Sequence, residues 1–312
     1  MNSLKNFPNE FFYGYQYLVE KGLDVEIIEE EDLRIHNNSF FLSYFNKFLN
    51  LFFDFPFLHF IKLLNKKKLS LLNSAEVIIT TTNAIGLSLG LLKNLNLIKK
   101  PIIFIAMGVI PLKTNIAKII YYRFLLKRLN IYSLSINEQK FLVRNLKNNY
   151  ISYLPFGVDM KYWRPNKSKI NKNYILAIGN DYARDWQTLI DAWEDDFPEL
   201  KLVTSSPLIT NKRNVTILKG SWGEEFLTDK QIRKLYLDSY FVIIPLKQGI
   251  QPSGQSSCLQ AMSCGKPVIM TKIMGLWDED LVKDREALLF VPPHSTIKLK
   301  KAIKELLKNK IL

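Results

Sequence analysis

Cysteine is scarce in this chain: the 312 residues include 2, Cys258 and Cys264, and both occur in one short segment. A secreted disulfide framework needs more pairs and a zinc site needs more ligands, so a reducing compartment fits best and we expect a cytoplasmic protein. The opening residues, MNSLKNFPNEFF, contain no apolar segment behind a basic start, so the sequence predicts no signal peptide. No run of about 18 apolar residues occurs, and we expect no membrane-spanning helix.

Acidic residues are also few. Lys and Arg number 43 against 29 Asp and Glu, which gives a formal net charge of +14. Such an excess attracts nucleic acid, anionic lipid or phosphorylated small molecules, and a simple bias in composition explains it equally well. No recognisable nucleic-acid-binding module supports such a partner, so we expect no nucleic acid.

The hydrophobic content of 47% and the length indicate a globular chain with more than one domain. A helix is expected over residues 10–22 and a strand over 25–28, and short apolar strands then alternate with helices to residue 150 and again from 174 to 309. This alternation predicts an α/β protein with two doubly wound parallel-sheet, Rossmann-like domains facing across a cleft. We place the first domain at 1–154, a polar linker at 155–173 and the second domain at 174–312.

The segment PSGQSSCLQAMSCGKPVIMT, residues 252–271, enters a helix through small residues and ends in a short strand. The unpaired N–H groups of a first helical turn, the partial positive charge there and the closeness that Gly254 allows together suit a phosphate. A plain helix capped by serine after a loop is the alternative interpretation.

The same segment resembles the nucleotide-sugar motif of GT-B glycosyltransferases, in particular retaining family 4 (glycosyl transferases group 1). LPFGVDMKYWRP resembles the interdomain segment of that family, and YILAIGNDYARDWQTLIDAW resembles the first strand, glycine turn and helix of its donor domain. GLWDEDLVKDREALLFVPP resembles the segment that follows the motif, so the resemblance is dense over 151–296 and looser over 10–150. It implies the GT-B fold and transfer of a sugar, with retention, from a nucleoside-diphosphate sugar to a glycan or lipid-linked acceptor. It also implies a role in the synthesis of cell-surface polysaccharide or glycoconjugates.

The resemblance also implies which residues bind the donor. The residues expected to hold the diphosphate are Gly179, Arg184, Gly254, Gln255, Ser256 and Ser257. Gln260 stands where the family has a glutamate that binds the ribose hydroxyls, and Trp222 and Lys247 are further candidates for base or phosphate contacts. Alternatives stay open: Arg184 could pair with Asp181 or Asp185 on the surface, Gln260 could face solvent, and Trp222 could be a packing residue.

Loss of the diphosphate leaves negative charge that fixed N–H groups and an arginine can hold, so we expect metal-independent transfer with no cofactor. The chain departs from the family at the second carboxylate, which would fall at or beside Pro252, and no histidine or carboxylate stands in AMGVI, residues 106–110. We therefore assign no catalytic base. The family's first strand is not found in residues 1–10, so the domain is a minimal version or is completed by a partner chain. A non-catalytic relative that binds a nucleotide or a partner chain without turnover is the alternative function.

Aromatic residues and lysines crowd residues 40–68. Rings at the headgroup level with lysines that reach anionic lipid predict a segment that lies on the inner face of the membrane. A second basic helix could extend this surface with Lys118, Arg123, Lys127 and Arg128. The alternative is an internal helix of the first domain that covers its sheet.

Overall fold

The computed structural model describes residues 7–29, 44, 46–48, 56–148, 150–165, 174–219, 227–277 and 280–308. The chain forms two compact units. We call Tyr17–Pro155 the N-terminal unit, and Met1–Gln16 together with Phe156–Leu312 the C-terminal unit. The start of the chain thus groups with residues far along the sequence, whereas the sequence analysis placed it in the first domain.

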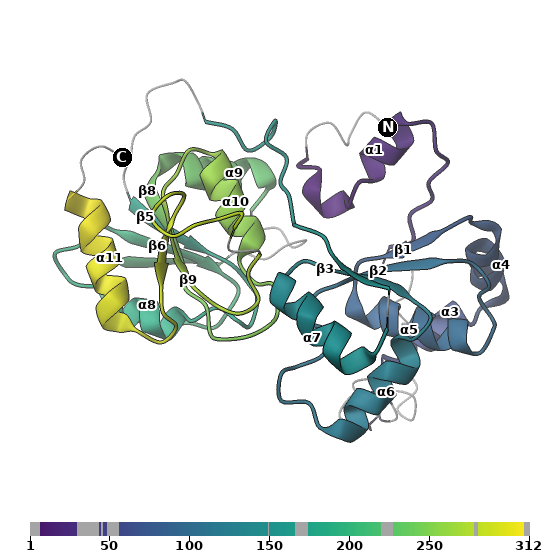
Figure 1. The fold of residues 1–312 in the computed structure, drawn as a ribbon. Helices are drawn as coiled ribbons and strands as arrows, with labels where there is room; N and C mark the ends of the chain where they lie inside the picture. Colours follow the sequence, from purple (N-terminus) through teal and green to yellow (C-terminus); the bar gives the residue numbers. More distant parts are fainter. Residues whose placement is uncertain are drawn as a thin grey trace. The chain divides into compact units, whose positions relative to one another are not determined.

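The N-terminal unit is built on a four-stranded parallel sheet with the order β1-β2-β3-β4 (Figure 1). Its elements are α1 (Tyr15–Glu20, which crosses the unit boundary), α3 (Phe57–Leu63), α4 (Lys66–Ser74), β1 (Ile78–Thr80), α5 (Asn83–Asn94), β2 (Ile102–Ala106), α6 (Ile116–Leu126), β3 (Asn130–Ser133), α7 (Ile136–Leu146) and β4 (Ile151–Tyr153). Because parallel strands joined in chain order by right-handed crossovers place every connecting helix on one face, the helices share one hydrophobic core.

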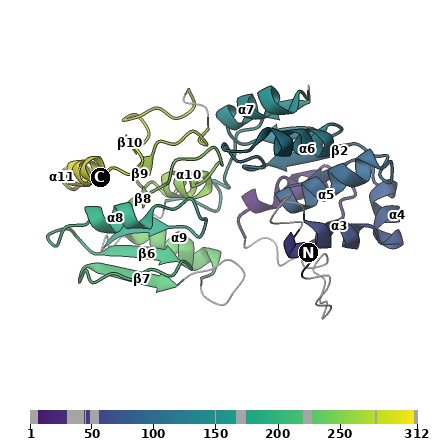
Figure 2. The same cartoon turned by 90° about the horizontal axis from the view of Figure 1, so that it is seen from below.

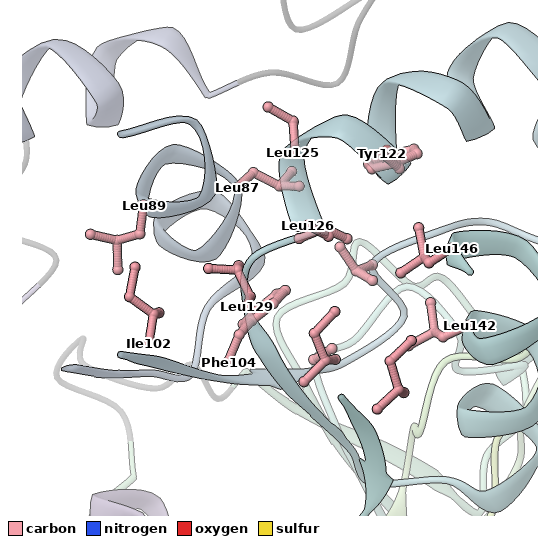
Figure 3. Packing of buried hydrophobic residues seen from close by; sticks show 14 of the residues in the cluster. Leu87, Leu89, Ile102, Phe104, Tyr122, Leu125, Leu126, Leu129, Leu142 and Leu146 are labelled. Carbon is pink, nitrogen blue, oxygen red and sulfur yellow. The ribbon is translucent and has the colours of Figure 1, made fainter. Parts of the chain in front are cut away.

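That core contains side chains of α3 to α7 together with alternate residues of the four strands. Figure 3 shows part of this core: Leu87 and Leu89 of α5, Tyr122, Leu125 and Leu126 of α6, Leu142 and Leu146 of α7, and Ile102 and Phe104 of β2. Gly86 of α5 allows this packing, because a Cβ there would lie 2.5 Å from the ring of Phe104.

Three details of residues 7–155 differ from the sequence prediction. Residues 23–29 form no strand, so the strand expected at 25–28 is wrong. The predicted helix over 10–22 is divided into a short 3-10 helix, η2 (Glu10–Phe12), and α1, because Tyr13 and Gly14 both have positive φ. In addition, β4 pairs with β3 immediately before the unit boundary, where no strand was predicted.

The C-terminal unit carries a six-stranded parallel sheet with the order β10-β9-β8-β5-β6-β7. Its elements are β5 (Tyr174–Ile178), α8 (Trp186–Ala192), β6 (Leu200–Thr204), β7 (Val215–Lys219), α9 (Asp229–Asp238), β8 (Ser239–Ile244), α10 (Gln255–Ser263), β9 (Val268–Thr271), β10 (Leu289–Val291) and α11 (Thr296–Lys308). The chain runs outward from β5 to β7 and then returns to pair β8 with β5, which makes the sheet doubly wound.

Each face of this sheet has its own core, as the alternation of a buried strand requires. Even-numbered residues of β5 pack with α9 and α10, and odd-numbered residues pack with α8 and α11 (Figure 1 and Figure 2). The predicted α/β class with parallel sheets is therefore confirmed. In such sheets the reversal between β5 and β8 opens a crevice at the carboxyl ends of the strands, where ligands usually bind.

Candidate functional site

The loops that follow β5 and β8 meet at this reversal of the strand order. The N–H of Asp185 donates to the carbonyl of Pro245 at 3.0 Å, and the N–H of Lys247 donates to the carbonyl of Ala183 at 2.7 Å. The loop after β8 is also tied to β9, because Leu246 N donates to Thr271 Oγ1 at 3.0 Å. Backbone hydrogen bonds thus hold the Gly179 turn beside the segment that leads into α10.

Gly179 ends β5 and lies directly under the guanidinium of Arg184. Its φ is +155°, and a Cβ at this position would lie 2.0 Å from Arg184 Nε, so no larger residue fits without moving the arginine. Arg184 itself is 4% exposed. Its Nε lies 2.9 Å from Asp181 Oδ2, and its Nη2 donates to Ser257 Oγ at 3.1 Å. The predicted alternative of an ion pair with Asp181 is therefore present, but the arginine is buried and also reaches α10.

The entrance of α10 faces the same guanidinium. Gly254 is the N-cap residue in the left-handed region, with φ +75°, and no side chain caps the helix there. A Cβ on Gly254 would lie 2.8 Å from Ile244 and 3.3 Å from Arg184 Nη1, so this atom is aimed at the first turn. Nη1 is buried and has no hydrogen-bond partner among the residues that the structure describes. A buried guanidinium and an uncapped helix N-terminus both favour an anion.

The remaining residues predicted for the diphosphate lie in the same loop and first turn. Ser256 is half-buried and Ser257 is buried, whereas the amide of Gln255 is turned away to donate to the carbonyl of Gly275 at 3.3 Å. Lys247 is exposed, and its Nζ lies 3.4 Å from the carbonyl of Tyr182. Trp222 lies outside the described residues.

Gln260 lies one turn further along α10 and is 2% exposed, so it does not face solvent. Its Oε1 accepts from Tyr236 Oη at 3.2 Å, and its Nε2 donates to Glu10 Oε1 at 2.9 Å. The same carboxylate accepts from Trp163 Nε1 at 2.6 Å and from the N–H of Asp159 at 3.2 Å. Gln260 is thus held between a tyrosine and a carboxylate, and both ends of its amide are engaged.

Sequence reasoning missed Glu10, because nothing near it in the chain suggests a role in this site. The expected interdomain segment offers a partial signal, since Asp159 and Trp163 belong to it. The carboxylate of Asp159 accepts from Lys161 N at 2.9 Å and Tyr162 N at 3.1 Å, and this turn presents the buried indole of Trp163 to Glu10. Tyr236 connects the Arg184 side of the site to Gln260, because its hydroxyl hydrogen-bonds both Ser257 and Gln260. Burial raises the pKa of this hydroxyl.

A second missed carboxylate lies in the N-terminal unit. The sequence analysis found no carboxylate in AMGVI, but Glu138 of α7 reaches this loop from 30 positions away. Its Oε1 accepts from Gly108 N at 2.6 Å, and its Oε2 accepts from Ser133 Oγ at 2.8 Å. Glu138 is 1% exposed, and burial raises the pKa of its carboxyl to about 7, with the hydrogen bonds from Ser133, Gly108 and Val109 opposing the shift.

Among the residues that the structure describes, no group of three or more His, Cys, Asp and Glu side chains is placed to hold a metal ion. Asp-x-Asp is a motif that can bind a metal together with a diphosphate, and the sequence contains one such triplet at 278–280. Its first two residues lie outside the described part of the chain. Metal-independent transfer therefore stays a prediction. Within the described segments, no helix combines the length and apolar character that crossing a bilayer requires.

Comparison with known proteins gives a family match over the C-terminal part of the chain. Residues 174–309, which hold the β5 turn and α10, match the family model of glycosyl transferases group 1. No curated protein matches the chain.

Several solved structures share the fold. Sucrose-phosphate synthase (tll1590) from Thermosynechococcus elongatus is 19% identical, with a TM-score of 0.64 over 81% of this chain and 70% of that chain. Anabaena Alr3699/HepE in complex with UDP-glucose is 16% identical, with a TM-score of 0.63 over 78% of this chain and 72% of that chain. A glycosyltransferase from Rickettsia africae ESF-5 is 15% identical, with a TM-score of 0.58 over 94% of this chain and 77% of that chain. At these identities the likeness establishes the fold, and the predicted GT-B architecture is confirmed.

Proposed function

From the GT-B fold and the match of residues 174–309 to glycosyl transferases group 1, we propose that this chain is a glycosyltransferase. In this proposal it takes a sugar from a nucleoside-diphosphate sugar, without a metal and with retention, and transfers it to a glycan or lipid-linked acceptor in cell-surface polysaccharide or glycoconjugate synthesis. The observation that carries the proposal is the buried guanidinium of Arg184. Among the described residues its Nη1 has no hydrogen-bond partner, and this atom lies beside the first turn of α10, which no described side chain caps.

A diphosphate would supply acceptors for the donors of this site that have no partner among the described residues. Burying a cation whose donors are not all satisfied is unfavourable, and phosphate oxygens accept from a planar arginine fork in a bidentate manner. The α10 N–H groups and the hydroxyls of Ser256 and Ser257 supply further donors. When the sugar–phosphate bond breaks, the electron pair stays on the diphosphate, and these fixed donors stabilise the charge as it develops.

The ribose side of the donor is assigned to Gln260, which lies one helical turn beyond Ser257. We include Glu10 in this part of the site, because its carboxylate contacts the Gln260 amide directly. In the family that the sequence resembles, position 260 carries a glutamate. In this chain the residue is Gln260, and the carboxylate of Glu10 lies beside its amide. A ribose hydroxyl can donate to the Gln260 oxygen and accept from its N–H if the bond to Tyr236 or to Glu10 is exchanged.

Calorimetric titration with UDP, UMP and uridine tests the phosphate site. UDP is the first probe, because a structural neighbour is described in complex with it. We expect binding that strengthens with each phosphate, and Arg184→Gln to weaken UDP binding by about tenfold or more, since charge-assisted bonds contribute about 1.5–3 kcal/mol. Arg184→Lys keeps the charge but loses the fork and should recover part of the affinity. Unchanged UDP affinity in Arg184→Gln with an unchanged thermal midpoint would refute the site.

A non-catalytic nucleotide-binding relative is the second candidate, favoured by the engagement of both ends of the Gln260 amide and by the lack of an acid at Pro252. The two candidates differ in turnover. A panel of nucleotide sugars, with free monosaccharide and nucleoside diphosphate as readouts, separates them. Binding through Arg184 without release of sugar from any donor would favour the second candidate.

A further inference from the structure

Helix α6 of the N-terminal unit is apolar on the side that faces away from the core. Its buried face contributes Ile119, Tyr122, Leu125 and Leu126 to the core, and the last three are labelled in Figure 3. The opposite face exposes Ile116 by 71%, Ile120 by 57% and Phe124 by 45%. Residues four apart lie on one side of a helix, so these side chains form a continuous stripe, which we call the α6 stripe.

The surroundings of the α6 stripe are basic. From Val77 to Asn137 the sequence contains no Asp or Glu, while it contains Lys99, Lys100, Lys113, Lys118, Arg123, Lys127 and Arg128, besides the buried Lys93. Exposed lysines stand at both ends of the stripe, Lys113 before α6 and Lys127 after it. The Nζ of Lys127 lies 4.9 Å from the centre of the Phe124 ring, so charge and apolar surface adjoin directly.

We propose that the α6 stripe docks onto the surface of an anionic lipid bilayer. Aliphatic side chains and a phenyl ring that enter the acyl boundary, with lysines at the headgroup level, are the features by which an interfacial helix binds such a surface. Isoleucines do not stack on bases, which argues against nucleic acid, and a stretch without acids complements anionic headgroups. The proposal concerns the N-terminal unit and does not depend on the transferase chemistry.

The sequence analysis placed the membrane surface mainly in residues 40–68 and named the basic helix that is now α6 as an extension of it. In residues 40–68, Phe57 and Phe60 of α3 pack against the core of the N-terminal unit, and Leu63 is buried within it. The part of the segment in α3 is therefore an internal helix of the N-terminal unit, which is the alternative that the sequence analysis left open. Tyr44 and Phe48 are exposed, and most of residues 40–55 lie outside the described residues.

The two native cysteines make a site-specific test practical. Cys258 and Cys264 are buried, and burial raises the pKa of their thiols to about 12 and about 11, so they stay unreactive while an exposed cysteine is labelled. We choose Ile120→Cys on the stripe and Ile297→Cys on α11, where Ile297 is 79% exposed, as the matched control. Each variant carries an environment-sensitive fluorophore and is mixed with vesicles of phosphatidylcholine, with or without phosphatidylglycerol.

We expect a blue shift at position 120 with the anionic vesicles at low salt, none with neutral vesicles and none at position 297. The double variant Lys113→Gln and Lys127→Gln should abolish the blue shift. The control is the double variant Lys298→Gln and Lys301→Gln on α11, which changes the net charge equally and should leave the blue shift unchanged. In flotation, Ile116→Ser, Ile120→Ser and Phe124→Ser together should lower recovery by about tenfold, because apolar burial is lost. No response at position 120, or equal responses with both vesicles, would overturn the proposal. So would self-association that the serine variant removes, since the stripe would then join two copies of the chain.

Discussion

Glu10 Oε1 lies 2.9 Å from Gln260 Nε2, although 250 positions separate the two residues. The contact places a carboxylate from the start of the chain against the helix that carries the predicted donor motif. It also makes the amide of Gln260 a donor to one neighbour and an acceptor from another, Tyr236. Charge at either position should therefore affect the other.

Gln260→Glu tests this coupling. The variant places two carboxylates at hydrogen-bond distance, and their repulsion together with the lost bond should cost about 1–3 kcal/mol at neutral pH. We expect Glu10→Gln with Gln260→Glu, which exchanges the two groups, to recover most of the loss, as a coupling energy of about 0.5–3 kcal/mol in a double-mutant cycle. Thermal midpoints of the four proteins measure it, and additive losses would show that the two side chains are uncoupled.

The ribose role of Gln260 can be tested without relying on stability. If its amide contacts a ribose hydroxyl, the wild-type chain should bind UDP several-fold more tightly than 2′-deoxyuridine diphosphate, since one hydrogen bond contributes about 0.5–1.5 kcal/mol. Gln260→Leu should then bind both ligands equally. A preference for UDP that persists in Gln260→Leu would remove Gln260 from the ribose site.

Gly179→Ala tests the position of Arg184. The new Cβ would lie 2.0 Å from Arg184 Nε, so the guanidinium must leave its place between Asp181 and Ser257. We expect UDP affinity to fall by about tenfold, with a stability cost of about 1–3 kcal/mol from overpacking. Gly249→Ala is the matched control, because a Cβ there has nothing within 4 Å. Equal UDP affinity in the two variants would mean that Arg184 does not bind the nucleotide.

Glu138 predicts a dependence of stability on pH. Its pKa is raised from 4.5 to about 7, so the folded chain holds a proton that the unfolded chain has released. This contribution is complete below pH 4.5 and is lost as the pH rises through about 7, a change of about 3 kcal/mol or about 6–12 °C in thermal midpoint.

Glu138→Gln mimics the protonated side chain, whose oxygen still accepts from Gly108 N while the other end donates to Ser133 Oγ. The difference in midpoint between this variant and the wild type should therefore grow in favour of the variant from pH 4.5 to about 8. Glu76→Gln, an exposed change in the same unit, is the control. A difference that does not vary with pH would mean that Glu138 is already ionised at low pH.

The GT-B fold and, from residue 76 on, every strand and helix except β4 were predictable from the sequence. The sequence also singled out the residues around Gly179 and Gly254, whose role in binding a donor stays a prediction. Each depends on local signals: alternation of short apolar strands with helices, glycines where a side chain cannot fit, and small residues at a helix entrance. The strand expected at 25–28 failed because four alternating residues predict a strand only if a neighbouring strand is available to pair with them, and pairing is not a local property.

Only the tertiary structure brought together groups that are distant in the chain. The carboxylate of Glu10 accepts a hydrogen bond from Gln260, 250 positions away. The carboxylate of Glu138 accepts one from Gly108, 30 positions away. The sheet reversal that joins the β5 and β8 loops likewise decides that Arg184 reaches Ser257 and leaves one nitrogen directed at α10. The composition showed that the chain is basic and rich in apolar residues, but burial determined which of those side chains form the core and which form the α6 stripe, because a helix with two apolar faces can bury only one of them.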